Sequence, residues 1–154
     1  MITINSTSTV VPSEPTPTRL LRLSKSDQMM QRSHEPVVFF YKPLNHNKTN
    51  PTPFHFETMK NSLSRVLVQY YLVAGRLRCI HSGRLELHCN AMGALLLEAF
   101  SEERLDELGD FAPNGKLQNL VPKFDYNTPI EEWPLLMVQI TGFRCGGFCV
   151  GVSL

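Results

Sequence analysis

Residues 134–154 read PLLMVQITGFRCGGFCVGVSL, and the expected architecture follows from this stretch. Two apolar runs, at 135–143 and 146–154, meet at a glycine-rich turn. β-Branched and aromatic residues favour strands, and glycine tolerates the positive φ angles of a tight turn. The stretch therefore predicts a hairpin of two buried strands. We expect the second strand, apolar from Phe148 to Leu154, to form an unprotected edge of its sheet.

Several other segments have the composition of strands. Residues 2–11 are rich in Thr, Ser, Val and Ile. Residues 36–41, PVVFFY, form a compact β-branched and aromatic run that predicts a central strand. Ser82-Gly83 separates RLRCI from RLELHC, as in a hairpin with a two-residue turn. Residues 93–100, GALLLEAF, predict one more strand.

The clearest helical pattern covers residues 53–71. Thr52 is a suitable N-cap, and Pro53 suits the first helical position. Six apolar residues then recur at helical spacing and form one stripe: Phe56, Met59, Leu63, Val66, Leu67 and Tyr70. Such a stripe is far more often part of a core than of a cofactor site.

Two short helices and three loops complete the pattern. One helix is expected to begin at a Ser24 cap and to run through Met30. The other is acidic, within SEERLDELGD, and ends at Gly109. Prolines and polar residues indicate loops at 13–18, 42–53 and 111–134.

The composition describes a single globular domain. The 154 residues suffice for one domain with its own core, and no repeat divides them. A net charge of +1 without long runs of like charge argues against nucleic acid as a partner. No segment has the roughly 18 consecutive apolar residues of a membrane-spanning helix, and residues 1–17 do not resemble a secretory signal. We therefore expect a cytoplasmic α+β protein with reduced cysteines.

One hypothesis is a zinc site, because four side chains of the types that bind zinc lie close together in the sequence: Cys79, His81, His88 and Cys89. With a two-residue turn at 82–83, strand alternation would place the first three on one face of the hairpin and Cys89 on the other. Four ligands could not then converge on one ion. A hairpin with reduced cysteines is the preferred reading, and no metal is expected.

Other familiar sites find little support. The glycines at 142–151 are followed by neither GK[ST] nor a helix, so a tight hairpin explains them better than a phosphate cradle. No GxSxG nucleophile elbow is present. His34, just before an apolar strand, fits either a pocket residue or a satisfied, partly buried histidine, and the second is the more frequent case.

Three long strings stand in an order that resembles the plant BAHD acyltransferases: SLSRVLVQYYLVAGRLR (62–78), GRLELHCNAMGALLLEAFSE (83–102) and PLLMVQITGFRCGGFCVGVSL (134–154). HEPVVFFYKP and PKFDYNTPIEEWP extend the resemblance, which is strongest to hydroxycinnamoyl transferases of the shikimate and spermidine types. It implies an α+β fold, a partial chloramphenicol-acetyltransferase-like domain with a mixed or antiparallel sheet and flanking helices. Residues 1–154 would be an incomplete first domain that ends just before the family's HxxxDG segment.

The resemblance also implies a reaction. In the family, a hydroxycinnamoyl or similar acyl group passes from a CoA thioester to an amine or hydroxyl acceptor, such as spermidine or shikimate. The histidine of HxxxDG acts as general base on the acceptor. Four positions after each histidine of this chain stand Val38, Asn50, Met59, Leu85 and Met92. None is aspartate, so we expect no catalytic residue within 1–154 and no activity from these residues alone.

Three residues match the acyl or acceptor pocket of the family: His34, Val37 and Phe39. Shikimate-type enzymes carry Ser and Tyr where this chain has Val37 and Phe39, so two hydroxyl groups are lost. A site that hydrogen-bonds a substrate hydroxyl selects strongly for it. The loss argues against shikimate and is compatible with a polyamine or another acceptor.

The implied partners are small molecules, namely acyl-CoA as co-substrate and the acceptor, without cofactor, nucleic acid or membrane. The resemblance implies a monomer for the longer enzyme, whereas we expect residues 1–154 alone to self-associate through the exposed last strand. The alternative is a truncated, non-catalytic paralogue that acts as an interaction module or has no function. Coding sequence that continues from Leu154 into HxxxD would distinguish the enzyme from this alternative.

Overall fold

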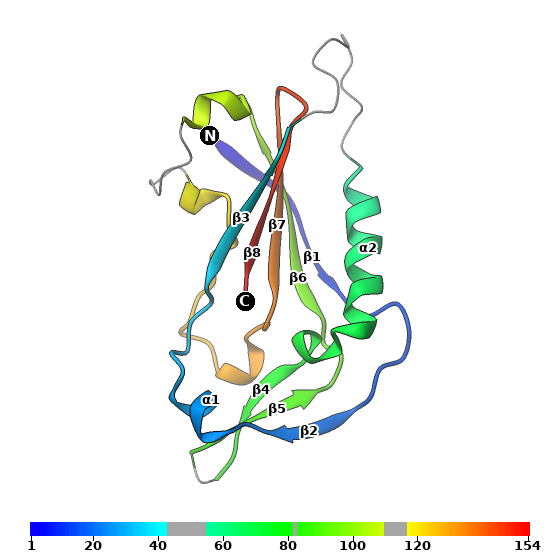
Figure 1. Ribbon diagram of the computed structural model, residues 1–154, viewed down its shortest axis with the longest axis vertical. Helices are drawn as coiled ribbons and strands as arrows, with labels where there is room; N and C mark the ends of the chain where they lie inside the picture. The colour runs from blue at the N-terminus through cyan, green and yellow to red at the C-terminus, as the bar shows by residue number, and fades with distance from the viewer. Residues whose placement is uncertain (43–54, 82, 110–116) are drawn as a thin grey trace.

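The computed structural model describes residues 1–42, 55–81, 83–109 and 117–154 (Figure 1). Two helices, four short 3₁₀ helices and eight strands make up the described part of the chain. In order, they are β1 (Ile2–Val10), β2 (Arg19–Arg22), α1 (Lys25–Met29), β3 (Pro36–Tyr41), α2 (Phe56–Gln69), η1 (Tyr71–Ala74), β4 (Arg76–Cys79), β5 (Leu85–Cys89), β6 (Ala94–Ser101), η2 (Leu105–Leu108), η3 (Leu117–Asn119), η4 (Ile130–Glu132), β7 (Met137–Phe143) and β8 (Phe148–Ser153).

The strands form two sheets. A five-stranded sheet has the order β1-β6-β7-β8-β3, and a three-stranded sheet has the order β2-β5-β4. Within the larger sheet β6 and β7 are parallel and the other neighbours are antiparallel. The smaller sheet lies at one end of the larger one, at the bottom of Figure 1. One mixed sheet, one antiparallel sheet and a flanking helix confirm the expected α+β class.

The hairpin predicted from residues 135–154 is present as β7 and β8. The amide of Phe143 donates to the carbonyl of Gly147 at 2.9 Å, and the amide of Gly146 donates to the carbonyl of Phe143 at 2.9 Å. Gly146 has a φ of 81°, which glycine adopts without strain. The turn therefore falls where the glycines indicated.

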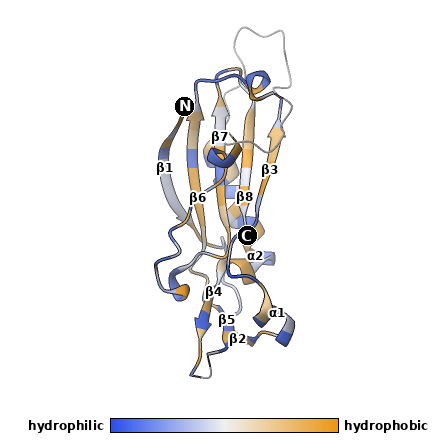
Figure 2. Ribbon diagram, turned by 90° about the vertical axis from the view of Figure 1, so that its left-hand side faces the viewer, coloured by the Kyte–Doolittle hydropathy of each residue, from blue (hydrophilic) through white to orange (hydrophobic). Residues whose placement is uncertain are grey.

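The positions expected for two strands of the larger sheet were wrong. The strand that contains Phe148 pairs with β7 on one side and with β3 on the other, so β8 is an interior strand. The strand at 36–41, expected to be central, is instead an edge of this sheet. In Figure 2, β3 and β8 are both largely hydrophobic, whereas the other edge strand, β1, is more hydrophilic. An apolar run thus identified a strand but not its place in the sheet, because that place depends on pairing with distant segments.

Helix α2 covers one face of the larger sheet. Leu67 is fully buried against Leu96, Val138 and Ile140, and Phe56, Met59 and Leu63 pack on the same cluster. Val66 and Tyr70 do not belong to this face, contrary to the stripe expected from the sequence, and are 50% and 64% exposed. Val66 lies at the border of the stripe, and Tyr70 follows the last helical residue.

The start of this helix is only partly testable. The N-cap is His55, whose side chain makes no capping hydrogen bond with the described residues. The expected cap Thr52 and first residue Pro53 lie outside the described residues.

The short helix α1 does begin at Ser24 as expected, because Ser24 and Asp27 form a reciprocal capping box. The expected acidic helix is one 3₁₀ turn, η2, which Gly109 ends with a φ of 83°.

The opposite face of the larger sheet is covered by the crossover that joins β6 to the parallel strand β7. In the described part of this crossover, Leu105, Leu108 and Leu120 are buried against Phe143 and Cys149. The crossover passes directly over Gly151 of β8. A Cβ at position 151 would lie 1.9 Å from the carbonyl oxygen of Leu120, so only glycine permits this approach.

The smaller sheet differs from expectation in two respects. Strand β2, Arg19–Arg22, was not expected, because four residues give little pattern until they pair with β5. In the hairpin, Cys79 pairs with Leu85, and the amide of Ile80 donates to the carbonyl of Arg84 at 2.9 Å. This register is shifted by one residue from that of a two-residue turn at 82–83.

A buried arginine joins the two sheets. Arg76 is 7% exposed, and its Nη1 donates to the carbonyl oxygens of Gly75 at 2.7 Å and Gly93 at 2.8 Å. Burial lowers the pKa of this guanidinium from its usual value. Gly93, with a φ of 92°, lies so close to Val10 that a Cβ would be 2.4 Å from its carbonyl oxygen. The junction thus depends on one cation and on backbone atoms.

We predict that Gly151→Ala destabilises the chain by about 1–3 kcal/mol, because the new methyl group displaces the backbone of the crossover at Leu120. Urea denaturation measures the effect. Gly142→Ala in β7 is the matched control, since the nearest contact of its new methyl group would be an ordinary 3.8 Å to the ring of Phe100 in β6. Equal stability of the two variants would contradict the close crossing.

A second prediction concerns Cys149, which lies in β8 and is fully buried. Burial raises the pKa of its thiol from 9.0 to about 11. The folded chain therefore keeps a neutral thiol while the unfolded chain ionises, so stability is full below pH 9 and falls as the pH rises to about 11. The loss is about 2–3 kcal/mol.

The control for this titration is Cys149→Ala, measured by urea denaturation between pH 8 and pH 11. The variant lacks the buried thiol, so the part of the stability loss that belongs to Cys149 disappears. A variant that loses as much stability as the original chain over this range would show that the thiol does not contribute.

Candidate functional site

The two apolar pocket candidates, Val37 and Phe39, lie on the edge strand β3. Both side chains are about half exposed, at 49% and 50%. Phe39 pairs with Val150 of β8, which packs on the α2 side of the sheet, so both candidates point to that side. With Tyr41, Val150 and Val152 they form an apolar strip on β3 and β8, here called the β3 strip.

His34 lies just before β3 and is bound from two directions. Its Nδ1 is 2.9 Å from the hydroxyl of Tyr126, and its Nε2 is 2.7 Å from the carbonyl oxygen of Pro134. Its backbone amide also donates to the Tyr126 hydroxyl, at 3.1 Å. We call this arrangement of His34, Tyr126 and Pro134 the His34 latch.

The latch determines the tautomer of the imidazole. A carbonyl oxygen only accepts, so Nε2 carries the proton and donates to Pro134. Nδ1 is then the acceptor, and the Tyr126 hydroxyl donates to it while accepting from the backbone amide. Both ring nitrogens and the backbone amide of this histidine thus have partners within the protein. His34 is therefore the satisfied, partly buried histidine that its sequence position left open.

An aromatic cluster surrounds the latch. Tyr126 lies edge-on to Trp133 with ring centroids 4.9 Å apart, and Phe124 lies edge-on to both Tyr126 and His34. The indole of Trp133 donates to the carbonyl of Thr128 at 2.9 Å. The sequence predicted a loop here and not an aromatic cluster. The three aromatic residues within ten positions were the one local indication of it.

The end of β8 lies beside the latch. The amide of Glu35 donates to the carbonyl of Leu154 at 2.9 Å, and the amide of Leu154 donates to that of Glu35 at 3.4 Å. This reciprocal pair continues the β3–β8 ladder by one step. Residue 154 is thus held next to His34, at one end of the β3 strip.

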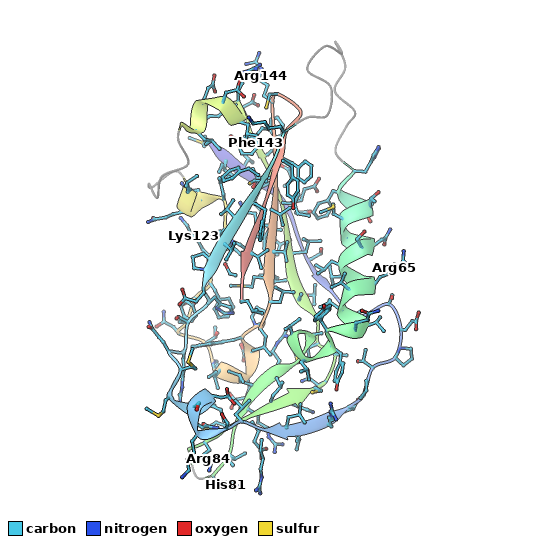
Figure 3. The ribbon with its side chains drawn as sticks, in the orientation of Figure 1. Arg65, His81, Arg84, Lys123, Phe143 and Arg144 are labelled. Atoms are coloured by element: carbon cyan, nitrogen blue, oxygen red, sulfur yellow. The ribbon has the colours of Figure 1, made fainter. Side chains whose placement is uncertain are left out.

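The cysteines and histidines of the small hairpin do not converge. The observed register places Cys79 on the same face as Cys89, with His88 on the other, so the expected grouping of Cys79 with His88 was wrong. His81 lies at the tip of the hairpin (Figure 3). Across the described ranges, no three His, Cys, Asp or Glu side chains gather so as to hold a metal ion.

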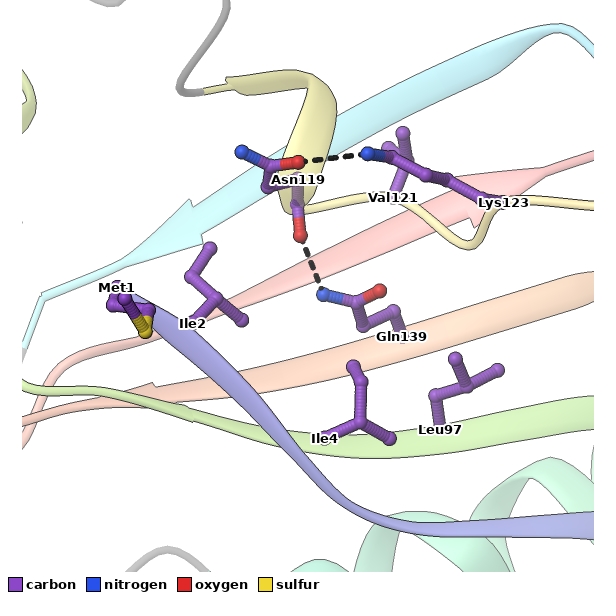
Figure 4. Close-up of a pocket in the computed structure, with 8 residues that line it drawn as sticks. All are labelled: Met1, Ile2, Ile4, Leu97, Asn119, Val121, Lys123 and Gln139. Carbon is purple, nitrogen blue, oxygen red and sulfur yellow. Dashed lines mark hydrogen bonds between the residues drawn. The ribbon is translucent and has the colours of Figure 1, made fainter.

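A cavity of about 390 Å³ opens on the crossover side of the sheet (Figure 4). Its lining consists of Met1, Ile2, Ile4, Leu97, Asn119, Val121, Lys123 and Gln139. Nε2 of Gln139 donates to the backbone carbonyl of Asn119 at 2.9 Å, and Nζ of Lys123 donates to the Asn119 side chain at 2.9 Å. The Gln139 bond holds the crossover against the sheet, whereas the Lys123 bond lies within the crossover.

The arginines that Figure 3 labels lie far apart. Arg144 is at the β7–β8 turn, Arg65 is on the outer side of α2, and Arg84 is near the opposite end of the molecule. In the part of the chain that the structure describes, no helix has the length and hydropathy needed to cross a membrane.

Several curated proteins are similar to this chain. Hydroxycinnamoyl-CoA:piscidic acid hydroxycinnamoyltransferase from Actaea racemosa is 47% identical over 154 residues, which are 100% of this chain and 34% of that protein. Shikimate O-hydroxycinnamoyltransferase from Nicotiana tabacum is 38% identical over 153 residues, or 99% of this chain and 34% of its own length. The chain thus spans about a third of the length of the curated relatives that it matches.

A solved structure and a family model agree with these relatives. The crystal structure of vinorine synthase matches 100% of this chain and 38% of its own, with a TM-score of 0.77 and 28% sequence identity. The family model described as the Transferase family matches residues 1–154. The chain therefore belongs to the Transferase family, the BAHD acyltransferases that its sequence resembles.

Proposed function

We propose that this chain is part of a longer acyl-CoA-dependent acyltransferase that transfers a hydroxycinnamoyl or similar acyl group to an amine or hydroxyl acceptor. The observation that carries the proposal is the match of the entire chain to hydroxycinnamoyltransferases of about three times its length. Acyl-CoA serves as co-substrate, and no cofactor is required. All four cysteines are free, which favours a reducing compartment, and we place the reaction in the cytoplasm.

The catalytic base is proposed to lie in an HxxxDG segment that follows Leu154 in the longer protein. Its histidine takes the proton from the acceptor N–H or O–H while the acceptor atom bonds to the thioester carbonyl carbon. The C–S bond then breaks, and CoA leaves as the thiol with that proton. The pairing of Leu154 with Glu35 supports this placement, because the next residues would emerge beside the β3 strip.

The β3 strip is proposed as one wall of the acyl and acceptor pocket, with Val37 and Phe39 in contact with substrate and His34 at its end. Their half-exposed apolar side chains support this role. An aromatic acyl group that covers such a surface gains about 25 cal/mol per Å² of apolar area removed from water. Neither Val37 nor Phe39 offers a hydrogen bond to a substrate hydroxyl, so we propose an acceptor other than shikimate, such as a polyamine.

The first test is to sequence the full-length transcript beyond the Leu154 codon and to express its product. We expect the reading frame to enter a histidine followed four residues later by aspartate. The full-length product should release CoA from hydroxycinnamoyl-CoA in the presence of an amine acceptor, whereas residues 1–154 alone should not. A stop codon directly after Leu154 in the mature transcript would exclude catalysis and leave the non-catalytic paralogue.

The second test restores the missing hydroxyl groups. We predict that Val37→Ser with Phe39→Tyr raises kcat/KM for shikimate, relative to spermidine, by about 10-fold or more, because each hydroxyl can pair with one on the acceptor. Steady-state kinetics of the full-length enzyme measure this ratio. Val37→Ala with Phe39→Leu enlarges the space without adding hydroxyls. An equal rise in this control would show that space, rather than hydrogen bonding, sets the preference.

A further inference from the structure

We propose that His34 is a positioning residue of the acyl-transfer reaction: the His34 latch holds the end of β8 and so directs the catalytic segment that follows it. The inference rests on the proposed function, because it concerns the longer enzyme. It assigns His34 a role in orientation rather than in hydrogen-bonding the substrate.

The first argument is that the imidazole has no nitrogen left for a ligand. Nε2 donates to Pro134 at 2.7 Å, and Nδ1 accepts from Tyr126 at 2.9 Å. A substrate that bonded to either nitrogen would have to displace a protein partner. Such an exchange replaces one hydrogen bond by another and therefore gains little.

The second argument is the short path from the latch to the chain end. Glu35, the next residue, exchanges both backbone hydrogen bonds with Leu154. The end of an edge strand frays readily unless it is tied down. The latch ties the start of β3 to residues 92 and 100 positions away, and this anchor extends to Leu154 through one residue.

The third argument is the rigidity of the partners. Tyr126 and Pro134 belong to the crossover, whose aromatic rings pack edge-on around the latch. Trp133, which precedes Pro134, is itself held by Thr128. The latch therefore anchors β8 to a fixed part of the fold, and a displacement of about 1 Å at a reacting group can lower a rate about 100-fold.

The decisive experiment is a double-mutant cycle in the full-length enzyme with His34→Leu and Tyr126→Phe. If the latch acts as one unit, each change lowers kcat about 10-fold to 100-fold, leaves both KM values within about 2-fold, and the double variant is no worse than either single one. His34→Gln, which keeps a donor toward Pro134, should recover part of the rate. Val37→Ala, on the substrate-facing strip, should instead raise KM.

A direct role in binding would produce a different pattern. In that case His34→Leu raises the KM of one substrate, and Tyr126→Phe, whose hydroxyl faces the imidazole rather than the β3 strip, changes little. That result would overturn the proposal. Additive losses in kcat would also overturn it, because they would mean that the two residues act separately.

A measurement on the full-length protein tests the latch without catalysis. Amide hydrogen exchange followed by NMR should show that Tyr126→Phe accelerates exchange at Leu154 and Glu35 about 10-fold or more, while Val138 in β7 is unchanged. Unchanged exchange at Leu154 would overturn the proposal. If the full-length enzyme transfers no acyl group at all, the proposed function fails, and the exchange data still decide whether the latch holds the chain end.

Discussion

The close passage of the crossover over Gly151 is the constraint on which the rest of the structure depends. Strands β6 and β7 are parallel, so the chain must return along the length of the sheet before β7 can begin. Its backbone at Leu120 lies against the α-carbon of Gly151. Buried leucines and the hydrogen bond from Gln139 to the backbone carbonyl of Asn119 then hold it there. A side chain at position 151 would lift this whole layer from the sheet.

The candidate site is a consequence of that passage. The same crossover brings Tyr126 and Pro134 to His34, and thereby secures the start of β3 and the end of β8. On the other face, α2 packs on β6 and β7 and leaves the β3 strip half exposed. The crossover therefore covers one face of the sheet, while the other face keeps an apolar wall beside the point where residue 154 is held.

Two buried polar side chains bind backbone carbonyls at places where separate layers of the fold meet. Arg76 binds the carbonyls of Gly75 and Gly93 where the two sheets meet, and Gln139 binds the crossover. Buried groups of this kind are tolerated when they are hydrogen-bonded. They specify how separate layers join, which apolar contacts alone leave loosely defined.

The sequence by itself determined the local elements and the family. The glycine turn at 144–147, the Ser24 capping box and the hairpin near residue 83 were predictable because their chemistry lies within a few residues. Only the tertiary structure decided that β8 is interior, that β3 is an edge, and that Cys79 faces away from His88. It also decided the hydrogen-bond partners of His34, which lie 92 and 100 residues away, because strand pairing and long-range hydrogen bonds leave no local pattern in the chain.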